Sequence, residues 1–173
     1  HLSRVPHRKS VPPVTLLQAY RQISLSGHSA RQYEEYSSAL AKQLATSDPD
    51  NAIVLSDLAR QSLSRGSPQG TSAAIKYLAR AIQLGSTSVD DYILLAELDA
   101  RSNHLPDAVR ILKRGISLAP YTRELYESLA VRYVKLGQYG ESLKVINKGL
   151  ELFPEDTLLR ILLDKVKPAI LAP

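Results

Sequence analysis

The chain has 173 residues, 44% of them apolar, which is enough to bury a sizeable core as one domain. It contains no cysteine, which excludes disulfides, thiol catalysis and cysteine-based zinc or iron–sulfur sites. The formal net charge is +5, but Arg4, Arg8 and Lys9 lie near the start, and the other 19 basic residues face 17 acidic ones. This balance, with one phenylalanine and no tryptophan to stack on bases, argues against a nucleic-acid partner.

Residues 1–14 form a predicted extended basic arm, because they hold Pro6, Pro12 and Pro13 and show no helical period. No apolar run approaches the roughly 18 residues that a membrane span needs. A chain without cysteine suits the cytoplasm, the periplasm or secretion equally well, so the sequence leaves the localisation unknown. Because the sequence starts at His1 and holds no methionine, we expect a processed form or a piece of a longer protein.

Helical spacing starts at residue 15, and residues 15–173 are expected to form one helical domain. Its first part, residues 15–47, is predicted to be a diverged helical hairpin. Gly27 and His28 interrupt the two helices. Ser29 and Gln32 then have the spacing of a capping box, which predicts the start of the second helix.

A repeat becomes legible after this hairpin. Residues 89–122 and 123–156 contain the same pattern at an offset of 34 positions. Residues 52–88 hold an earlier copy, in which the longer loop at residues 66–70 absorbs three extra residues at little thermodynamic cost. A period of this length is typical of a helical solenoid. The positions that recur are Tyr92, Leu95, Ala96, Ala108, Leu112, Gly115, Leu118 and Pro120, which return as Tyr126, Leu129, Ala130, Ser142, Ile146, Gly149, Leu152 and Pro154.

The order of these residues resembles the tetratricopeptide repeat (TPR) family, in which an aromatic, Leu-Gly, Tyr, Ala, Phe and Pro follow one another. The resemblance implies an all-α fold: a right-handed helical solenoid of stacked antiparallel helix pairs. It would contain about three clear repeats, the diverged N-terminal hairpin and a C-terminal capping helix over residues 157–167. First helices would line a concave groove and second helices the outer wall, with small residues such as Gly115 at close helix crossings. The matching residues are Tyr126, Leu129, Ala130, Tyr133, Gly137, Tyr139, Ser142, Ile146 and Pro154.

The sequence offers no pattern of catalytic chemistry. No two of the four histidines share a helical face at metal-ligand spacing. The glycine patterns that cradle phosphate and the nucleophile elbow are missing. Glu34 and Glu35, like Asp90 and Asp91, are adjacent in sequence and diverge on a helix. We therefore expect no enzyme, no metal site and no cofactor.

The resemblance to TPR proteins implies a partner-binding groove that is mildly acidic and carries an apolar strip. Some TPR domains clamp a terminal carboxylate with Lys, Arg and Asn. The places that match these clamp positions would repel a carboxylate here, so the groove favours a mixed or basic extended segment; they hold Ser56, Arg60, Asp90, Leu94, Glu124 and Ser128. The predicted lining residues are Asp57, Arg60, Asp90, Ile93, Leu94, Glu97, Arg101, Glu124, Glu127, Val131 and Lys135.

Asp99 occupies the position that Tyr133 holds in the next repeat, where the family usually has an aromatic residue. Two interpretations stay open. Its carboxylate either points into the groove, or it is partly solvated and paired with a nearby Arg such as Arg101 or Arg132. A buried unpaired carboxylate would be costly enough to shift its own ionisation.

Two other surfaces allow alternatives. Basic pairs at i, i+4 recur on the second helices, and form either a solvated wall or a site for an acidic partner. The last helix spreads its apolar residues over about 200°, more than a cap needs, and the excess either packs under the Pro168–Pro173 tail or binds another chain. The basic ridge comprises Lys76, Arg80, Arg110, Arg114, Lys144 and Lys148, and the assembly helix comprises Leu158, Ile161, Leu162 and Val166.

These features predict a non-enzymatic scaffold that holds an extended segment of an unidentified protein or peptide partner in its groove. The alternative is an assembly module that packs through its last helix against another subunit or domain, self-association included. A further expectation is one domain of a larger bacterial protein, periplasmic or secreted. The spacing of His1, Arg4 and Pro6 is similar to segments that precede TPR regions in some bacterial multihaem cytochromes, although no haem-attachment motif is present.

Overall fold

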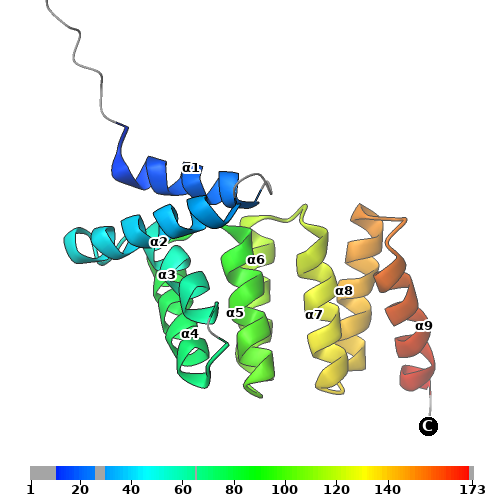
Figure 1. Ribbon diagram of the computed structural model, residues 1–173. Coiled ribbons are helices and arrows are strands. Elements are labelled where there is room, and N and C mark those ends of the chain that lie inside the picture. Colours follow the sequence, from blue (N-terminus) through cyan, green and yellow to red (C-terminus); the bar gives the residue numbers. More distant parts are fainter. Residues whose placement is uncertain (1–10, 26–29, 65, 172–173) are drawn as a thin grey trace, which may run out of the picture. The chain divides into compact units, whose positions relative to one another are not determined.

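The computed structural model describes residues 11–25, 30–64 and 66–171. These residues form nine α-helices and no strand (Figure 1), which confirms the all-α prediction. The first ten residues of the predicted arm and the Ser29 cap lie outside the described ranges. The chain divides into two compact units, His1–Leu84 (unit 1) and Gly85–Pro173 (unit 2), which are described separately below.

Unit 1 holds two helical hairpins. Each helix packs against the next, and α1 also contacts α3. Leu17 of α1, Ala41 and Leu44 of α2 and Val54 of α3 form the buried core of the first three helices. Helix α1 starts two residues before the predicted hairpin, since proline is well suited to the first turn of a helix. The helices are α1 (Pro13–Leu25), α2 (Ala30–Ser47), α3 (Ala52–Leu63) and α4 (Pro68–Gln83).

The longer loop of the first repeat connects α3 to α4, and local chemistry fixes its end. The Ser67 side chain accepts a hydrogen bond from the backbone N–H of Gly70 at 3.0 Å and so caps α4. Pro68 occupies the first turn, where its missing N–H costs nothing. Any Cβ at Gly70 would collide with the backbone carbonyl oxygen of Ser62, so only glycine lets the loop close this tightly.

Unit 2 consists of two layers. Consecutive helices pack against each other, and the first helices also pack directly, α5 on α7 and α7 on α9. Within the described part of unit 2, α6 and α8 have no packing of comparable extent. The first helices are therefore the more closely spaced layer, so unit 2 curves toward them. The surface that the first helices turn away from the second helices is here called the first-helix face, and this curvature makes it concave. The helices are α5 (Val89–Arg101), α6 (Leu105–Leu118), α7 (Arg123–Lys135), α8 (Tyr139–Leu152) and α9 (Thr157–Leu171).

Small residues permit the close crossings of unit 2. A Cβ built on Gly149 of α8 would lie 2.5 Å from Cδ1 of Leu159 and 3.2 Å from Cβ of Tyr126. Gly115 of α6 is enclosed in the same way one repeat earlier. A repeated glycine at this position thus lets three helices meet at van der Waals distance.

In each repeat of unit 2, a side chain of the first helix also forms a hydrogen bond with the turn before it. The hydroxyl groups of Tyr92 and Tyr126 donate hydrogen bonds to the carbonyl oxygens six residues earlier, at 3.0 and 2.9 Å. In the third copy the guanidinium of Arg160 donates to the equivalent carbonyl, with Nε at 3.0 Å and Nη2 at 2.6 Å. Tyr92 and Tyr126 therefore combine core packing of the ring with a hydrogen bond from the hydroxyl group.

Helix α9 corrects one predicted boundary. It continues through Pro168 to Leu171, beyond the predicted end at residue 167. Proline removes one i→i−4 hydrogen bond, yet the helix needs only one further turn after it. Residues 168–171 consequently do not fold back over the apolar side chains of α9. The described part of the tail therefore does not cover the apolar excess of this helix.

Candidate functional site

Most of the predicted groove residues lie on α5 and α7, and their register leads us to expect them on the first-helix face of unit 2. The three aliphatic side chains and Glu127 are half-buried, and the charged side chains around them are exposed. Because α5 and α7 run in the same direction in an antiparallel stack, equivalent positions lie side by side. The residues concerned are Asp90, Ile93, Leu94, Glu97, Arg101, Glu124, Glu127, Val131 and Lys135.

The two predicted groove residues of unit 1 behave differently. Asp57 of α3 is only 5% exposed, and its carboxylate accepts a hydrogen bond from Nε2 of Gln61 at 2.7 Å. The prediction that Asp57 lines an accessible groove is therefore wrong, because its side chain is buried. Arg60 is half-buried and donates from Nη1 to the backbone carbonyl of Ser56 at 3.1 Å.

Charge on the first-helix face is separated along the helix axes. Asp90 and Glu124 lie in the first turns of α5 and α7 and form an acidic edge. Arg101 and Lys135 lie in the last turns and form a basic edge. This order matches the helix dipoles, which favour acids at N-termini and bases at C-termini. The aliphatic residues lie between the two edges along the helices, so charges of opposite sign are separated; the mild acidity of the groove stays a prediction.

Glu97 has a structural partner that the sequence did not reveal. Its carboxylate forms an ion pair with the guanidinium of Arg132 on α7. The Arg132 side chain is 8% exposed and its Nε lacks a hydrogen-bond partner among the described residues, whereas the Glu97 side chain is 50% exposed. Arg132 occupies the position of Leu98 in the preceding repeat, which is an apolar core site. Glu97 thus neutralises a buried cation, and its charge is largely committed within the fold.

A second acidic group lies where α9 begins. The buried carboxylate of Asp156 accepts a hydrogen bond from the backbone N–H of Leu159 at 2.7 Å and lies 3.6 Å from Nε of Arg123. Burial raises the pKa of Glu127, the hydrogen bond to Asp156 and the charges of Asp156 and Glu124 raise it further, and Arg123 opposes them. Asp156 was not predicted from the sequence, although an Asp immediately before an apolar helix is a recognisable capping signal.

Asp99 lies near an arginine, as the second interpretation expected, but that residue is Arg110 rather than Arg101 or Arg132. It is buried, and burial raises the pKa of its carboxyl group, as does the charge of Asp107, while His104 and Arg110 lower it. These groups belong to α6 and the turn before it. Asp99 therefore faces its own second helix rather than the first-helix face, and Arg132 pairs with Glu97 instead.

Asp91 is another buried carboxylate that the sequence analysis did not single out. As expected, it diverges from Asp90, which is exposed. Asp91 is fully buried and accepts a hydrogen bond from the Ser86 hydroxyl at 2.6 Å. The repeat carried the necessary signal, because Leu125 and Leu159 hold the equivalent core positions one and two repeats later.

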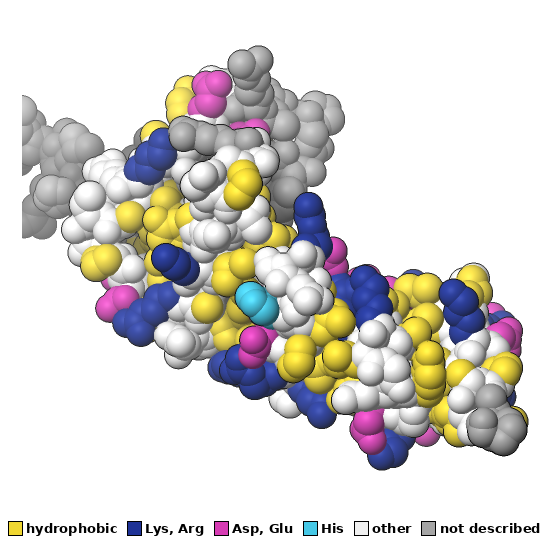
Figure 2. Space-filling model, turned by 90° about the horizontal axis from the view of Figure 1, so that it is seen from below, with side chains coloured by type: hydrophobic (Ala, Val, Ile, Leu, Met, Phe, Trp, Pro, Cys, Tyr) yellow, Lys and Arg dark blue, Asp and Glu magenta, His cyan; other side chains and the backbone are white. Residues whose placement is uncertain are grey.

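The basic ridge of the second helices is interleaved with acidic residues. Lys148 pairs with Glu151 at 2.8 Å, and Arg80 of unit 1 pairs with Asp50 at 3.0 Å. Figure 2 shows basic, acidic and hydrophobic side chains intermixed on one face of the molecule. The paired charges favour a solvated wall over a site for an acidic partner. Two more ridge residues form i, i+3 pairs at 2.7 Å: Arg110 with Asp107, and Lys144 with Glu141.

The predicted assembly helix divides into core and surface residues. Leu162 and Val166 are buried in the core with Leu159 and Tyr126, so their assignment to an assembly surface is wrong. Leu158 and Ile161 are 40% and 54% exposed. No described helix is both long and apolar enough to span a bilayer.

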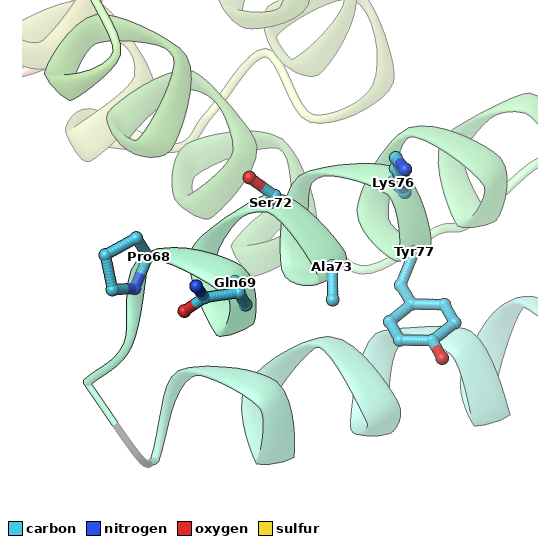
Figure 3. Close-up of a pocket in the computed structure, with 6 residues that line it drawn as sticks. All are labelled: Pro68, Gln69, Ser72, Ala73, Lys76 and Tyr77. Carbon is cyan, nitrogen blue, oxygen red and sulfur yellow. The ribbon is translucent and has the colours of Figure 1, made fainter.

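A shallow depression of about 530 Å³ lies along α4 in unit 1. In the close-up, Ala73 and Tyr77 point to one side of the helix, and Ser72 and Lys76 point to the other (Figure 3). The amine and the phenol of the lining therefore do not converge on one point, and the depression lies outside the predicted groove. Its lining consists of Pro68, Gln69, Ser72, Ala73, Lys76 and Tyr77.

Comparison with known proteins identifies the fold. No family model and no curated protein matches the sequence, but solved structures do. A thermophilic TPR protein from Thermus thermophilus, TTC0263, matches with a TM-score of 0.61 at 21% identity, over 95% of this chain and 84% of that one. The first TPR of Spaghetti (RPAP3), bound to the HSP90 peptide SRMEEVD, matches with a TM-score of 0.59 at 17% identity, over 70% and 97%.

A chain of the APC/C hetero-tetramer Cut9–Hcn1 matches with a TM-score of 0.64 at 14% identity. The match covers 85% of this chain, which spans only 29% of that one. The class of protein is thereby defined: this chain has the tetratricopeptide fold. The resemblance drawn from Tyr126, Ala130, Gly137 and Pro154 is confirmed at the level of the fold.

Proposed function

We propose that this protein is a non-enzymatic protein–protein interaction scaffold, and that the first-helix face of unit 2 binds an extended segment of a partner protein. The observation that carries the proposal is the apolar strip of Ile93, Leu94 and Val131 between an acidic and a basic edge. A segment laid across this face would bury the strip and meet charges of opposite sign at either edge.

The solved structure of the Spaghetti TPR with its HSP90 peptide supports the proposal by showing a protein of this fold with a short peptide bound. That peptide carries three acidic residues in its sequence SRMEEVD. The acidic edge here, formed by Asp90 and Glu124, would repel such a sequence. We therefore favour a basic or mixed segment as the partner of this chain.

Peptide selection followed by charge reversal tests this function. Phage-displayed random dodecapeptides would be selected on the whole chain, and the enriched peptides would then be measured against two double variants. Asp90→Lys/Glu124→Lys reverses the acidic edge and should weaken binding at least tenfold. Glu141→Lys/Glu151→Lys makes the same charge change on α8 and should leave binding within twofold.

Glu97 is unsuitable for this test, because its replacement by Lys would place a second cation against the buried Arg132 and perturb the fold. Equal effects of the two double variants, with circular dichroism showing both folded, would refute binding at the first-helix face. Failure to enrich any peptide would refute it as well.

Assembly through α9 is the weaker alternative, since only Leu158 and Ile161 of its four predicted residues are exposed. Membership of a larger protein has a parallel in the Cut9–Hcn1 chain, which is much longer than this one.

A further inference from the structure

We infer that α9 provides the apolar anchor of the first-helix face. In this proposal the partner segment seats a large apolar side chain on Leu158 and Ile161 and directs Lys or Arg toward Asp90 and Glu124. The inference rests on the proposed function and specifies the partner as a protein segment in which an apolar residue accompanies basic ones.

The 34-residue register places the two anchor residues on this face. Leu158 occupies the position of Asp90 in α5 and Glu124 in α7, and Ile161 occupies the position of Ile93 and Glu127. Helix α9 packs directly against α7, as α7 does against α5. Leu158 and Ile161 therefore continue, on α9, two rows of equivalent positions that run across α5 and α7.

The fold does not need these two side chains. Leu159, Leu162 and Val166 supply the contacts of α9 with the core of unit 2 and are buried. Leu158 and Ile161 remain 40% and 54% exposed on the same helix. The apolar width of α9 thus exceeds what its packing uses, and the excess lies toward the concave surface.

The other free side of α9 is polar, which separates the anchor from an ordinary solenoid end. In α7, Tyr126 and Ala130 are buried in one core cluster with Ile146 of α8 and Leu159 of α9. The equivalent positions of α9 hold Arg160 and Asp164, both exposed. Charged residues there suit solvent rather than another helix pair, so the apolar excess is not a seat for a next repeat.

Charge decides which kind of segment fits. Glu124 and Glu127 occupy the rows of the anchor residues one helix away, and Asp90 lies in the same row one helix further. An acidic segment anchored on Ile161 would bring like charges together, whereas Lys or Arg beside the apolar residue would be attracted. A second copy of this chain, joined symmetrically through α9, would bring two acidic edges toward each other.

The dodecapeptides selected on wild-type protein test the anchor directly. We expect them to carry Lys or Arg together with one large apolar residue. Binding of a synthetic selected peptide, followed by fluorescence anisotropy, should weaken at least tenfold in Leu158→Gln/Ile161→Gln, as expected when burial of one large apolar side chain is lost. Ile170→Gln is the matched control, because Ile170 lies on the same helix and is 42% exposed, and it should bind within twofold of wild type.

The outcomes separate the two proposals. If Asp90→Lys/Glu124→Lys abolishes binding and Leu158→Gln/Ile161→Gln does not, the anchor is refuted while the first-helix face stands. Selected peptides that are acidic or lack an apolar residue refute the anchor as well. If no peptide is enriched, both proposals fail. A dimer that dissociates only in Leu158→Gln/Ile161→Gln, detected by light scattering, would assign α9 to self-association instead.

Discussion

Gly149 offers the most direct test of how the repeats of unit 2 pack. An alanine there would place its Cβ 2.5 Å from Cδ1 of Leu159, 3.2 Å from Cβ of Tyr126 and 3.6 Å from Cγ of the same ring. Leu159 and Tyr126 are buried, so neither side chain can swing into solvent. Gly149→Ala must therefore spread α8, α9 and α7 apart or force Leu159 from its rotamer.

Two effects of opposite sign determine the size of the change. Alanine is favoured over glycine within a helix by about 1 kcal/mol. Overpacking a core by one methyl group costs roughly 1–3 kcal/mol. The steric cost outweighs the gain in helix propensity, and we expect a net destabilisation of about 1 kcal/mol. For a cooperative unit of 60–100 residues this lowers the Tm by about 4–8 °C.

Thermal and urea unfolding followed by circular dichroism would measure this change, with Gly140→Ala as the matched control. Gly140 lies in the same helix, and a Cβ there would meet nothing within 4 Å. Gly140→Ala should be neutral or stabilise by up to about 1 kcal/mol, because only the helix propensity acts. Adding Leu159→Ala to Gly149→Ala should cost less than the sum of the two single changes. Stabilisation by Gly149→Ala equal to that of the control, together with additive changes, would refute the packing argument.

Other predictions concern buried charges and the α3–α4 loop. Glu97→Gln should lower the free energy of unfolding, measured with urea, by about 1–2 kcal/mol, because Arg132 loses its counter-charge. Adding Arg132→Leu to this variant should restore most of the lost stability. If it does not, the two residues do not act as a purely local pair. The raised pKa values of Glu127 and Asp99 mean that both carboxyl groups favour folding when protonated, a contribution present below their unfolded pKa values and lost as pH rises through the folded ones. Glu127→Gln/Asp99→Asn should therefore gain Tm relative to wild type between pH 4 and pH 7, and a constant difference across this range would count against the raised pKa values. Gly70→Ala should destabilise unit 1 by more than about 1 kcal/mol in urea unfolding, since backbone atoms must move; an unchanged midpoint would contradict that contact.

The sequence predicts the helical array well where the repeat is regular. The offset of 34 residues predicts the helices α5 to α8, because α5 and α7 bury equivalent positions such as Tyr92 and Tyr126. The offset cannot predict an interaction between two residues that each depart from the repeat, such as Glu97 with Arg132. The periodicity indicates in which helix layer a residue lies, but not which residue it contacts. The buried Asp57 was misplaced for the same reason: its position faces the groove in the ideal repeat, whereas here its side chain is buried and accepts a hydrogen bond from Gln61.

The end of α9 shows a second limit. Proline is a strong helix-ending signal in sequence, yet a helix that needs only one further turn tolerates it at Pro168. The functional surface is likewise only partly readable. The repeat identified the rows that contain Leu158 and Ile161, but only the structure separates them from Leu162 and Val166, which belong to the core.

The hydrogen bonds from Tyr92, Tyr126 and Arg160 to the carbonyl groups six residues earlier bear on how such an array can change in length. Donor and acceptor are always six residues apart, and the boundary between two blocks falls between them: each block of 34 residues begins with a donor and ends with the acceptor for the next block. Excision or duplication of a whole block would leave every remaining turn with a hydrogen bond of this kind. An insertion of a few residues between donor and acceptor would break one. Shortening and lengthening by complete repeats is therefore the change in length that this architecture accommodates most readily.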